Sequence, residues 1–394
     1  MAEPSIFHSQ NSTTMKCKLE TLTPCHIGSG NTLLKELNFV VDGKGDDEML
    51  GVISAEKIYA VLGEHGVDQW CQAIDRKESV WSVVKTQNTN TQLTDICSKV
   101  ALISRNVNNA ICQELREHIA SNGVLYIPGS SIKGAIVSAI VGENRAKLSL
   151  PATLRAKNNS VEEQLFVKPT ISKRGEVKYN PQNSDLRFLR VSDAYFDNAD
   201  IAIVECYGLN LRELGSLIDN KARMLVECIN AEQQAFVDIQ IKTELQKQCR
   251  SAVPSLPEAM QSEDNLLNAI NAHTKRLLKE ELRFWSDQEN RNYYHIDTDE
   301  EQEEIEYYLD NIKDALRECN RCKSNCEAII RVGYGSGWRF MTGSWIDEGG
   351  RNWKNIAAIV RNDRSDKYKQ YDFPKTRRVG LGTPFGFIKI TKVE

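Results

Sequence analysis

The sequence predicts an α+β fold in which two domains each contain a small antiparallel sheet with helices on one face. Three observations support this fold class. Segments with strand character fall into two groups along the chain, and a long helical segment interrupts each group. The length of 394 residues exceeds what a single hydrophobic core usually organises. Hydrophobic residues make up 41% of the chain, which is enough to fill two such cores.

The first domain is expected to span residues 12–205, with a helical insert at about 54–120. Alternation of apolar and polar residues predicts its strands at residues 16–22, 37–41, 49–53, 124–127, 188–191 and 201–206. A proline and two glycines predict a loop at residues 23–30, and Ser54 is suited to cap the first helix of the insert. The polar stretch 155–186 is predicted to be a mobile loop.

The second domain is expected to span residues 206–394, with a helical insert at about 256–326. A polar turn between residues 226–229 and 236–241 predicts a β-hairpin. Further strands are predicted at residues 328–332 and 387–390. The order of strands and helices in the two halves is compatible with distant copies of one βαββαβ unit.

Charge is distributed unevenly along the chain. The net charge of −4 and the pI of about 6.0 argue, taken alone, against nucleic acid as a partner. However, residues 297–310 carry eight acids and no base, whereas residues 351–394 carry eleven bases against four acids. Within the acidic run, Thr298 and Glu301 predict a capping box at the start of a helix. The pattern predicts either one basic face that meets a partner or two solvated surfaces of opposite sign.

The sequence indicates a cytoplasmic protein. The apolar stretch Ile132–Val141 contains Lys133 and is far shorter than the roughly 20 residues that a membrane span needs. The first 16 residues lack the charged and apolar regions of a signal peptide. No membrane association is therefore expected.

The 11 cysteines do not resemble a disulfide framework, because their number is odd and most have apolar neighbours. Cys319, Cys322 and Cys326 have a spacing that would place the three thiols on one face of a helix. Zinc would need a fourth ligand, and no second pair at this spacing occurs in the chain. Burial is the preferred explanation, and no metal or other cofactor is expected.

The segment Tyr126–Ala135 combines a short strand, a Gly/Ser turn and the start of an apolar helix. The free amides and positive dipole of a helix N-terminus, with Ser130, Ser131 and Lys133, predict contact with a phosphate. The segment is not a Walker P-loop, since the lysine precedes Gly134 and no Ser or Thr follows it. The alternative is a well-capped helix of the core.

The segment Arg331–Arg339 has three alternating glycines directly after a strand. Glycine permits positive φ and lets a ligand approach the backbone. The G-x-G-x-G pattern does not match a dinucleotide-binding fingerprint. Tyr334 and Trp338 are candidates to stack on bases, and the two terminal arginines are candidates to hold phosphates. Alternatively, the loop places both aromatic residues in the core.

Two other segments carry candidate residues. His26, in the loop at 23–30, has the chemistry of a general base, although most such histidines only form local hydrogen bonds. Near the C-terminus, Lys375, Arg377 and Arg378 precede the glycine-rich residues 380–386. These cations predict a clamp on a nucleic-acid backbone, or else a solvated turn.

Taken together and in this order, LTPCHIGSG, YIPGSSIKGAI, LRVSDA, RVGYGSGW and PFGFIKI resemble the RAMP superfamily of CRISPR-associated proteins. Within it, the chain is most similar to the fifth Csm subunits of type III-A effector complexes. The resemblance implies tandem ferredoxin-like (RRM-like) domains with helical insertions. It implies a non-catalytic subunit that caps the filament end and holds the 3′-proximal part of the crRNA. It further implies a role in crRNA 3′-end maturation and in target RNA binding. The implied partners are crRNA, target RNA, the repeating RAMP subunit of the backbone, other Csm subunits and host nucleases.

The motifs and the resemblance together give a set of predicted RNA contacts. The resemblance implies that the glycines and serines of the three loops, with Lys133, face RNA, and that the arginines beside LRVSDA contact its backbone. The full set is His26, Gly28, Ser29, Gly30, Ser130, Ser131, Lys133, Arg187, Arg190, Gly333, Tyr334, Gly335, Gly337, Arg339, Lys375, Arg377 and Arg378.

Two other functions compete with this one. Related RAMP proteins cleave guide precursors, so the chain could be a metal-independent endoribonuclease. His26 would then abstract the 2′-hydroxyl proton and Lys133 would stabilise the phosphorane. A third possibility is a subunit that cuts target RNA with a metal and a loop aspartate, for which Asp193 is the nearest candidate.

Overall fold

A computed structural model defines the fold. It describes residues 14–76, 78–103, 113–148, 161–175, 177–210, 217–249, 254, 256–287, 296, 298–341, 343–345, 376–380 and 382–393. Lys375 and most of the basic run at 351–394 therefore lie outside the described residues.

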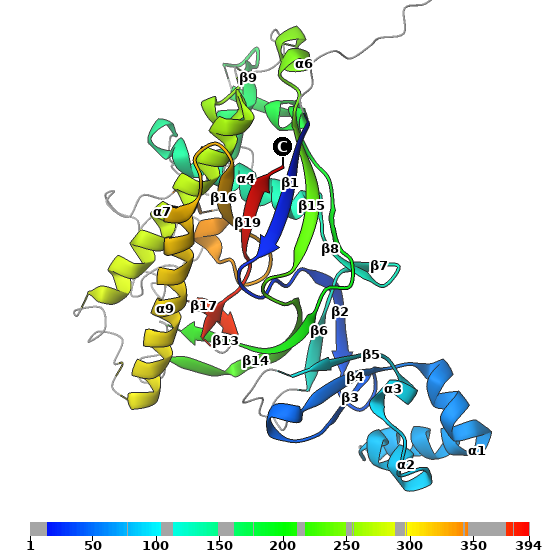
Figure 1. Cartoon of the computed structure of the whole chain (residues 1–394). Coiled ribbons are helices and arrows are strands. Elements are labelled where there is room, and N and C mark those ends of the chain that lie inside the picture. The colour runs from blue at the N-terminus through cyan, green and yellow to red at the C-terminus, as the bar shows by residue number, and fades with distance from the viewer. Residues whose placement is uncertain are drawn as a thin grey trace, which may run out of the picture.

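A five-stranded antiparallel sheet forms the centre of the molecule (Figure 1). Its strands, in spatial order, are β11 (Leu189–Val191), β15 (Gln234–Ile241), β1 (Thr14–Thr21), β19 (Phe387–Lys392) and β16 (Glu327–Arg331). Helix α4 (Gly129–Glu143) lies in the chain between β1 and β11, and α7 (Glu263–Ser286) lies between β15 and β19. Without the edge strand β16, this is the order of a βαββαβ ferredoxin-like unit.

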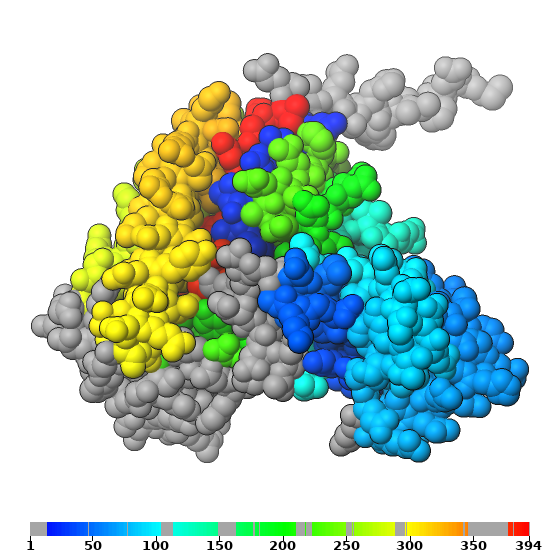
Figure 2. All heavy atoms as spheres, turned by 60° about the horizontal axis from the view of Figure 1, so that its bottom comes forward, coloured from blue at the N-terminus to red at the C-terminus, as the bar shows by residue number. Residues whose placement is uncertain are grey.

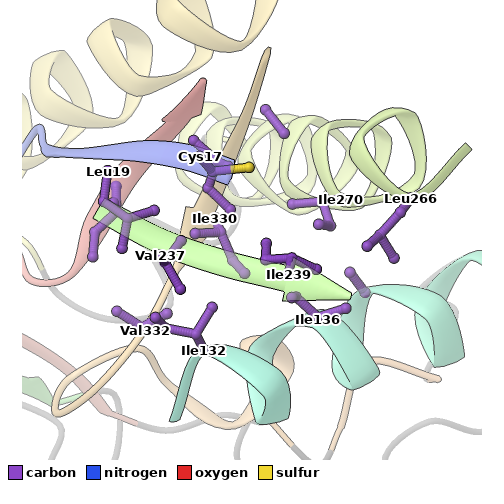
Figure 3. Close-up of a cluster of buried hydrophobic side chains, with 14 of the residues drawn as sticks. Cys17, Leu19, Ile132, Ile136, Val237, Ile239, Leu266, Ile270, Ile330 and Val332 are labelled. Carbon is purple, nitrogen blue, oxygen red and sulfur yellow. The ribbon is translucent and has the colours of Figure 1, made fainter. Parts of the chain in front are cut away.

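The main core lies between this sheet and the two helices. Buried and exposed residues alternate along β1, so that Cys17 and Leu19 point to the helices (Figure 3). Ile132 and Ile136 of α4 meet the same core, as does Ile270 of α7. Each fully buried side chain of this size contributes roughly 1.5–3 kcal/mol, which accounts for the tight packing of α4 on the sheet.

A second, six-stranded sheet lies beside the first. Its order is β18 (Thr383–Pro384), β17 (Thr376–Gly380), β13 (Ile201–Asn210), β14 (Ile218–Ile229), β6 (Glu114–His118) and β2 (Gly28–Leu34). Among the described strand pairs of this sheet, β14 and β6 run parallel and the others run antiparallel. A domain boundary at residue 205 would cut β13, and both large sheets contain strands from either side of it. The chain thus interweaves the two sheets rather than completing one before the other.

The first helical insert forms a compact unit at one end of the molecule (Figure 1). Ser54 caps α1 as predicted, because its hydroxyl accepts a hydrogen bond from the Lys57 amide at 3.5 Å. The unit contains α1 (Ala55–Asp75), α2 (Val80–Gln87), α3 (Leu93–Ile96) and the sheet β3 (Phe39–Asp42), β4 (Met49–Ile53), β5 (Cys97–Leu102). The predicted helical region to residue 120 was therefore too long. Residues 97–102 pair with β4, and this tertiary pairing overrides their local preference.

Helix α9 (Asp299–Arg321) packs on α7 and forms a second core with it. Thr298 caps α9 by accepting a hydrogen bond from the Glu301 amide at 3.2 Å. The reciprocal half of the predicted capping box is absent from these residues, because Glu301 accepts instead from the Thr298 hydroxyl and the Leu217 amide. The acidic residues Glu300, Glu303, Glu306 and Asp310 are exposed on the outer face of α9, whose yellow surface is visible in Figure 2.

Three other predictions of local structure were wrong. Residues 226–229 and 236–241 do not form a hairpin, because β14 and β15 belong to different sheets. Within the stretch 155–186, predicted to be a loop, the structure has α5 (Val161–Phe166) and the paired strands β9 (Val167–Ile171) and β10 (Val177–Ser184). The loop predicted at 23–30 ends at Gly28, where β2 begins by pairing with His118.

The remaining elements are short. A small sheet contains β12 (Ala194–Phe196), β8 (Val124–Ile127) and β7 (Ala120–Ser121). Helix α6 spans Thr243–Gln248, and 3-10 turns lie at Gly45–Asp47, Arg145–Lys147, Asp185–Phe188, Glu258–Met260 and Trp338–Phe340.

Candidate RNA-binding site

Two of the predicted glycine-containing segments meet in space. The glycine-rich loop, residues 333–337, follows β16 and lies against the first turns of α4. Between them is a hollow of ≈ 310 Å³. The described residues that line this α4–loop hollow are Ser131, Gly134, Ala135, Ser138, Arg331, Val332, Gly333, Ser336, Phe340 and Met341. Arg331 is the one charged side chain among them.

The glycine-rich loop needs glycine for two separate reasons. Gly333, Gly335 and Gly337 have φ values of 80°, 79° and 82°, a region that residues with a Cβ rarely adopt. A Cβ at Gly333 would also lie 2.5 Å from the carbonyl oxygen of His26. The Tyr334 amide donates to that same oxygen at 2.9 Å. The loop therefore docks on the segment at 23–30, which the sequence had predicted as a second RNA-facing loop.

The N-terminus of α4 already has an anionic partner. The Gly129 amide donates to Oδ1 of Asp193 at 2.7 Å, and a Cβ at Gly129 would lie 2.3 Å from the Val191 carbonyl oxygen. A carboxylate at this position satisfies a free amide and the positive end of the helix dipole. Ser130 remains exposed at the terminus, while Ser131 lines the α4–loop hollow. Asp193 thus has a capping role, which does not favour its use as a catalytic aspartate.

Lys133 points away from the hollow. Its Nζ donates to the carbonyl oxygens of Leu186 and Leu189 at 2.6 and 2.8 Å, which ties α4 to the start of β11. Burial lowers the pKa of this ammonium group, and nearby Arg190 lowers it further. Arg190 itself is exposed on β11.

His26 is buried beneath the glycine-rich loop. Its Nδ1 lies 2.6 Å from the carbonyl oxygen of Glu227, and its ring makes an edge contact with that of His118 at 5.9 Å. Burial lowers the pKa of His26, and it lowers the pKa of His118 to about 4. Both imidazoles are therefore neutral near pH 7. His26 is also 1% exposed, so it does not have the access that a general base for RNA requires.

Tyr334 is partly buried, and its ring is held between side chains of the protein rather than presented for base stacking. The guanidinium groups of Arg116 and Arg378 lie over its ring, at 5.7 and 5.3 Å from the centroid. Its hydroxyl donates to Sδ of Met224 at 3.5 Å, and burial raises its pKa to about 12. Together with the edge contact to His26 at 5.6 Å, these contacts anchor the loop in the second sheet.

Two predicted phosphate-binding arginines have internal carboxylate partners. Arg339 Nη2 donates to Oε2 of Glu280 at 2.5 Å. Arg377 donates from Nε and Nη2 to the two carboxylate oxygens of Glu281, at 2.9 and 3.2 Å. Both glutamates belong to α7, so these ion pairs fasten the exit of the loop and β17 to that helix.

The other predicted contacts are dispersed. Ser29 donates to Oε2 of Glu117 at 3.2 Å on the β2–β6 pair, with Gly28 and Gly30 beside it. Arg187 donates to the carbonyl oxygen of Gln182 at 2.8 Å and covers the ring of Phe188. The structure does not bring these residues to the α4–loop hollow.

Sequence reasoning named Arg331 as a candidate to hold a phosphate but left it out of the full set of predicted RNA contacts, and it did not consider Arg116. Arg331 ends a strand whose three preceding residues are apolar and buried, and a charged residue in such a position is a signal that could have been followed. Arg116 lies in β6 with no local motif around it, and only the pairing of β6 beside β14 brings it to Tyr334.

The described residues contain no group of three or more His, Cys, Asp or Glu side chains arranged to hold a metal ion. Cys319 is buried at the end of α9, whereas Cys326 is exposed beyond the helix. The spacing had predicted that the thiols at 319, 322 and 326 share one buried face of a helix, and this prediction was wrong. None of the described helices has the length and apolar character to cross a membrane.

The RAMP superfamily model matches residues 18–340, and the chain belongs to this superfamily. Two solved structures are similar to it over nearly the full length. The crystal structure of T. onnurineus Csm5 has a TM-score of 0.65 and 18% identity, and the match covers 94% of this chain and 99% of that one. A chain in the cryo-EM structure of a type III-A Csm–crRNA–target RNA ternary complex has a TM-score of 0.69 and 19% identity, with 96% and 100% covered. At these identities the similarity shows the fold, and it confirms the predicted fold class of ferredoxin-like units with added helices. No curated protein matches the chain.

Proposed function

We propose that the protein is a non-catalytic, RNA-binding subunit of a cytoplasmic type III-A Csm ribonucleoprotein. The observation that carries the proposal is the α4–loop hollow. There, the Gly/Ser start of α4 and the glycine-rich loop, which come from distant parts of the sequence, form one concave surface beside a buried arginine. Backbone exposed at glycines and a cationic wall suit a nucleic-acid backbone, whatever its sequence.

The similarity to Csm5 supports a more detailed role. We propose that the subunit caps one end of the filament and holds the 3′-proximal part of the crRNA. Because the subunit would contact that end, it would also influence 3′ maturation by host nucleases. The remaining partners in this proposal are target RNA and the other Csm subunits, especially the repeating RAMP subunit.

The contacts of the candidate catalytic residues do not favour the endoribonuclease alternative. His26 is buried and bonded to a backbone carbonyl, and Lys133 is bonded to two others. A general base and a phosphorane-stabilising cation must both reach the same scissile phosphate. Neither side chain is among the described residues that line the α4–loop hollow.

Binding of purified protein to a fluorescent single-stranded guide RNA would test the proposal. We expect binding that weakens with salt and no cleavage of the RNA in the presence of a chelator. RNA cleavage by the purified protein that His26→Ala abolishes would overturn the non-catalytic assignment. Absence of RNA binding, both alone and in a reconstituted complex, would overturn the proposal itself.

A further inference from the structure

Arg331 is a buried cation without an ion-pair partner among the described residues. It is 8% exposed. Its Nε donates to the carbonyl oxygen of Phe385 at 2.9 Å, and its Nη2 donates to that of Gly335 at 3.1 Å. The rings of Phe387 and Phe340 lie at 4.7 and 5.2 Å from its guanidinium carbon and hold it in place. A guanidinium has five N–H donors, so these two bonds leave three of them for a ligand.

Three arginines near Arg331 differ from it because each forms an ion pair. Arg377 pairs with Glu281, Arg339 pairs with Glu280, and Arg276 contacts both Glu280 and Glu143. Glu281 attracts Arg331 through space, but two bonds from Arg377 already engage that carboxylate. Three cations thus share three carboxylates, and the positive charge of Arg331 remains in excess.

An uncompensated buried charge is costly, and an anionic ligand removes that cost. The α4–loop hollow gives such a ligand access to Arg331, and its described lining contains no carboxylate that would repel it. The walls are small at Gly134 and Ser131, so a chain of nucleotides can approach closely. The apolar side chains of Phe340 and Met341 complete the lining and suit the sugar or base of the same nucleotide.

We propose that the Arg331 guanidinium binds one phosphodiester group of single-stranded RNA in the α4–loop hollow. This inference rests on the proposed RNA-binding function. Of the two arginines named from the sequence as candidates to hold phosphates in the segment Arg331–Arg339, it assigns the contact to Arg331, because Arg339 is paired with Glu280. It also differs from the phosphate site predicted at the N-terminus of α4, where Asp193 is bound. A phosphodiester carries the negative charge that no described carboxylate supplies to Arg331 as an ion pair.

The test uses two pairs of matched variants in the full-length protein. Arg331→Gln removes the charge, and Arg317→Gln makes the same change on the exposed face of α9. Gly134→Asp places a carboxylate beside the hollow, and Gly134→Asn is its neutral counterpart of the same shape. A Cβ at Gly134 would meet no atom within 4 Å, so both variants at this position should fold.

Affinity for a fluorescent mixed-sequence single-stranded RNA is measured across a salt series. We expect Arg331→Gln to weaken binding at least tenfold, as for other truncated buried charge contacts, and to reduce the log–log salt slope by about 0.7. Gly134→Asp should weaken binding more than Gly134→Asn, which adds the same bulk without the charge, while Arg317→Gln, far from the hollow, should bind like the original protein.

The results separate this inference from the function on which it rests. If the unmodified protein binds RNA and neither Arg331→Gln nor Gly134→Asp changes affinity or slope, the assignment of Arg331 is wrong and RNA binding stands. If the unmodified protein binds no RNA, the proposed function fails first. If inorganic phosphate stabilises the unmodified protein but not Arg331→Gln, while both bind RNA equally, the site takes free phosphate and not RNA.

Discussion

Replacing Glu281 by alanine should destabilise the protein more than any surface substitution. Its carboxylate accepts two hydrogen bonds from Arg377, one from Nε1 of Trp285 at 2.7 Å and one from the Tyr308 hydroxyl at 3.0 Å. Arg377 is 12% exposed and Glu281 is 21% exposed, so removing the carboxylate leaves a largely buried cation and two buried donors without it. Breaking a buried pair in this way costs about 3–5 kcal/mol.

Urea unfolding would measure this difference, with Glu244→Ala as the control. Glu244 pairs with Lys247 on α6, and both side chains are about half exposed, so its removal should cost less than about 1 kcal/mol. A decrease in the free energy of unfolding below about 1 kcal/mol for Glu281→Ala would refute the view that this carboxylate holds β17 and the loop exit to α7. An equally large decrease in the free energy of unfolding for Glu244→Ala would also refute it.

The destabilisation caused by Glu281→Ala should depend on pH in a predictable direction. Burial alone would raise the pKa of Glu281, but Arg377 outweighs it and the pKa is lowered from its ordinary 4.5. A lowered carboxyl pKa contributes stability above the unfolded value, and this contribution disappears as pH falls through the folded value. The stability gap between the original protein and Glu281→Ala should therefore narrow below about pH 4.5. A gap that stays constant to lower pH would contradict the assignment.

Three further predictions concern single positions. Burial raises the pKa of Asp185 from 3.8 to about 6, so ionisation opposes folding; the gain in melting temperature from Asp185→Asn should grow between about pH 4 and pH 6 and stay constant above pH 6, and a pH-independent change would contradict this. Gly333→Ala should cost more stability than Gly337→Ala in denaturant unfolding, because both have positive φ but only Gly333 lies against the His26 carbonyl; equal costs would refute the docking of this loop. Lys133→Met should lower the melting temperature but leave the salt slope of RNA binding unchanged, since its ammonium bonds two carbonyls; a reduced slope would show a phosphate contact instead.

The sequence predicted the local elements better than their pairing. Residues 49–53 form a strand and Ser54 caps a helix as expected, because alternation and capping are read within a few residues. The expected hairpin at 226–241 failed because a short polar turn also permits two strands to enter different sheets. Whether two consecutive strands pair with each other depends on which distant strands pair with each of them, and a single sequence does not reveal these long-range pairings.

In the candidate site, too, local conformation was predicted from the sequence and long-range contacts were not. The alternating glycines at 333–337 do adopt the positive φ that the sequence predicted. The partners of individual side chains were not predictable. Nothing near Lys133 in sequence indicates the carbonyls of Leu186 and Leu189, and nothing near Arg377 indicates Glu281, almost a hundred residues earlier. Arginines with distant acidic partners are thus indistinguishable, in sequence, from arginines available to RNA.

Isolation of the tagged protein from its native host, with sequencing of bound RNA and identification of bound proteins, tests the central claim most directly. The account predicts guide RNAs, enriched in their 3′-proximal parts after nuclease trimming, together with other Csm subunits. Protein recovered without RNA and without those subunits would contradict it.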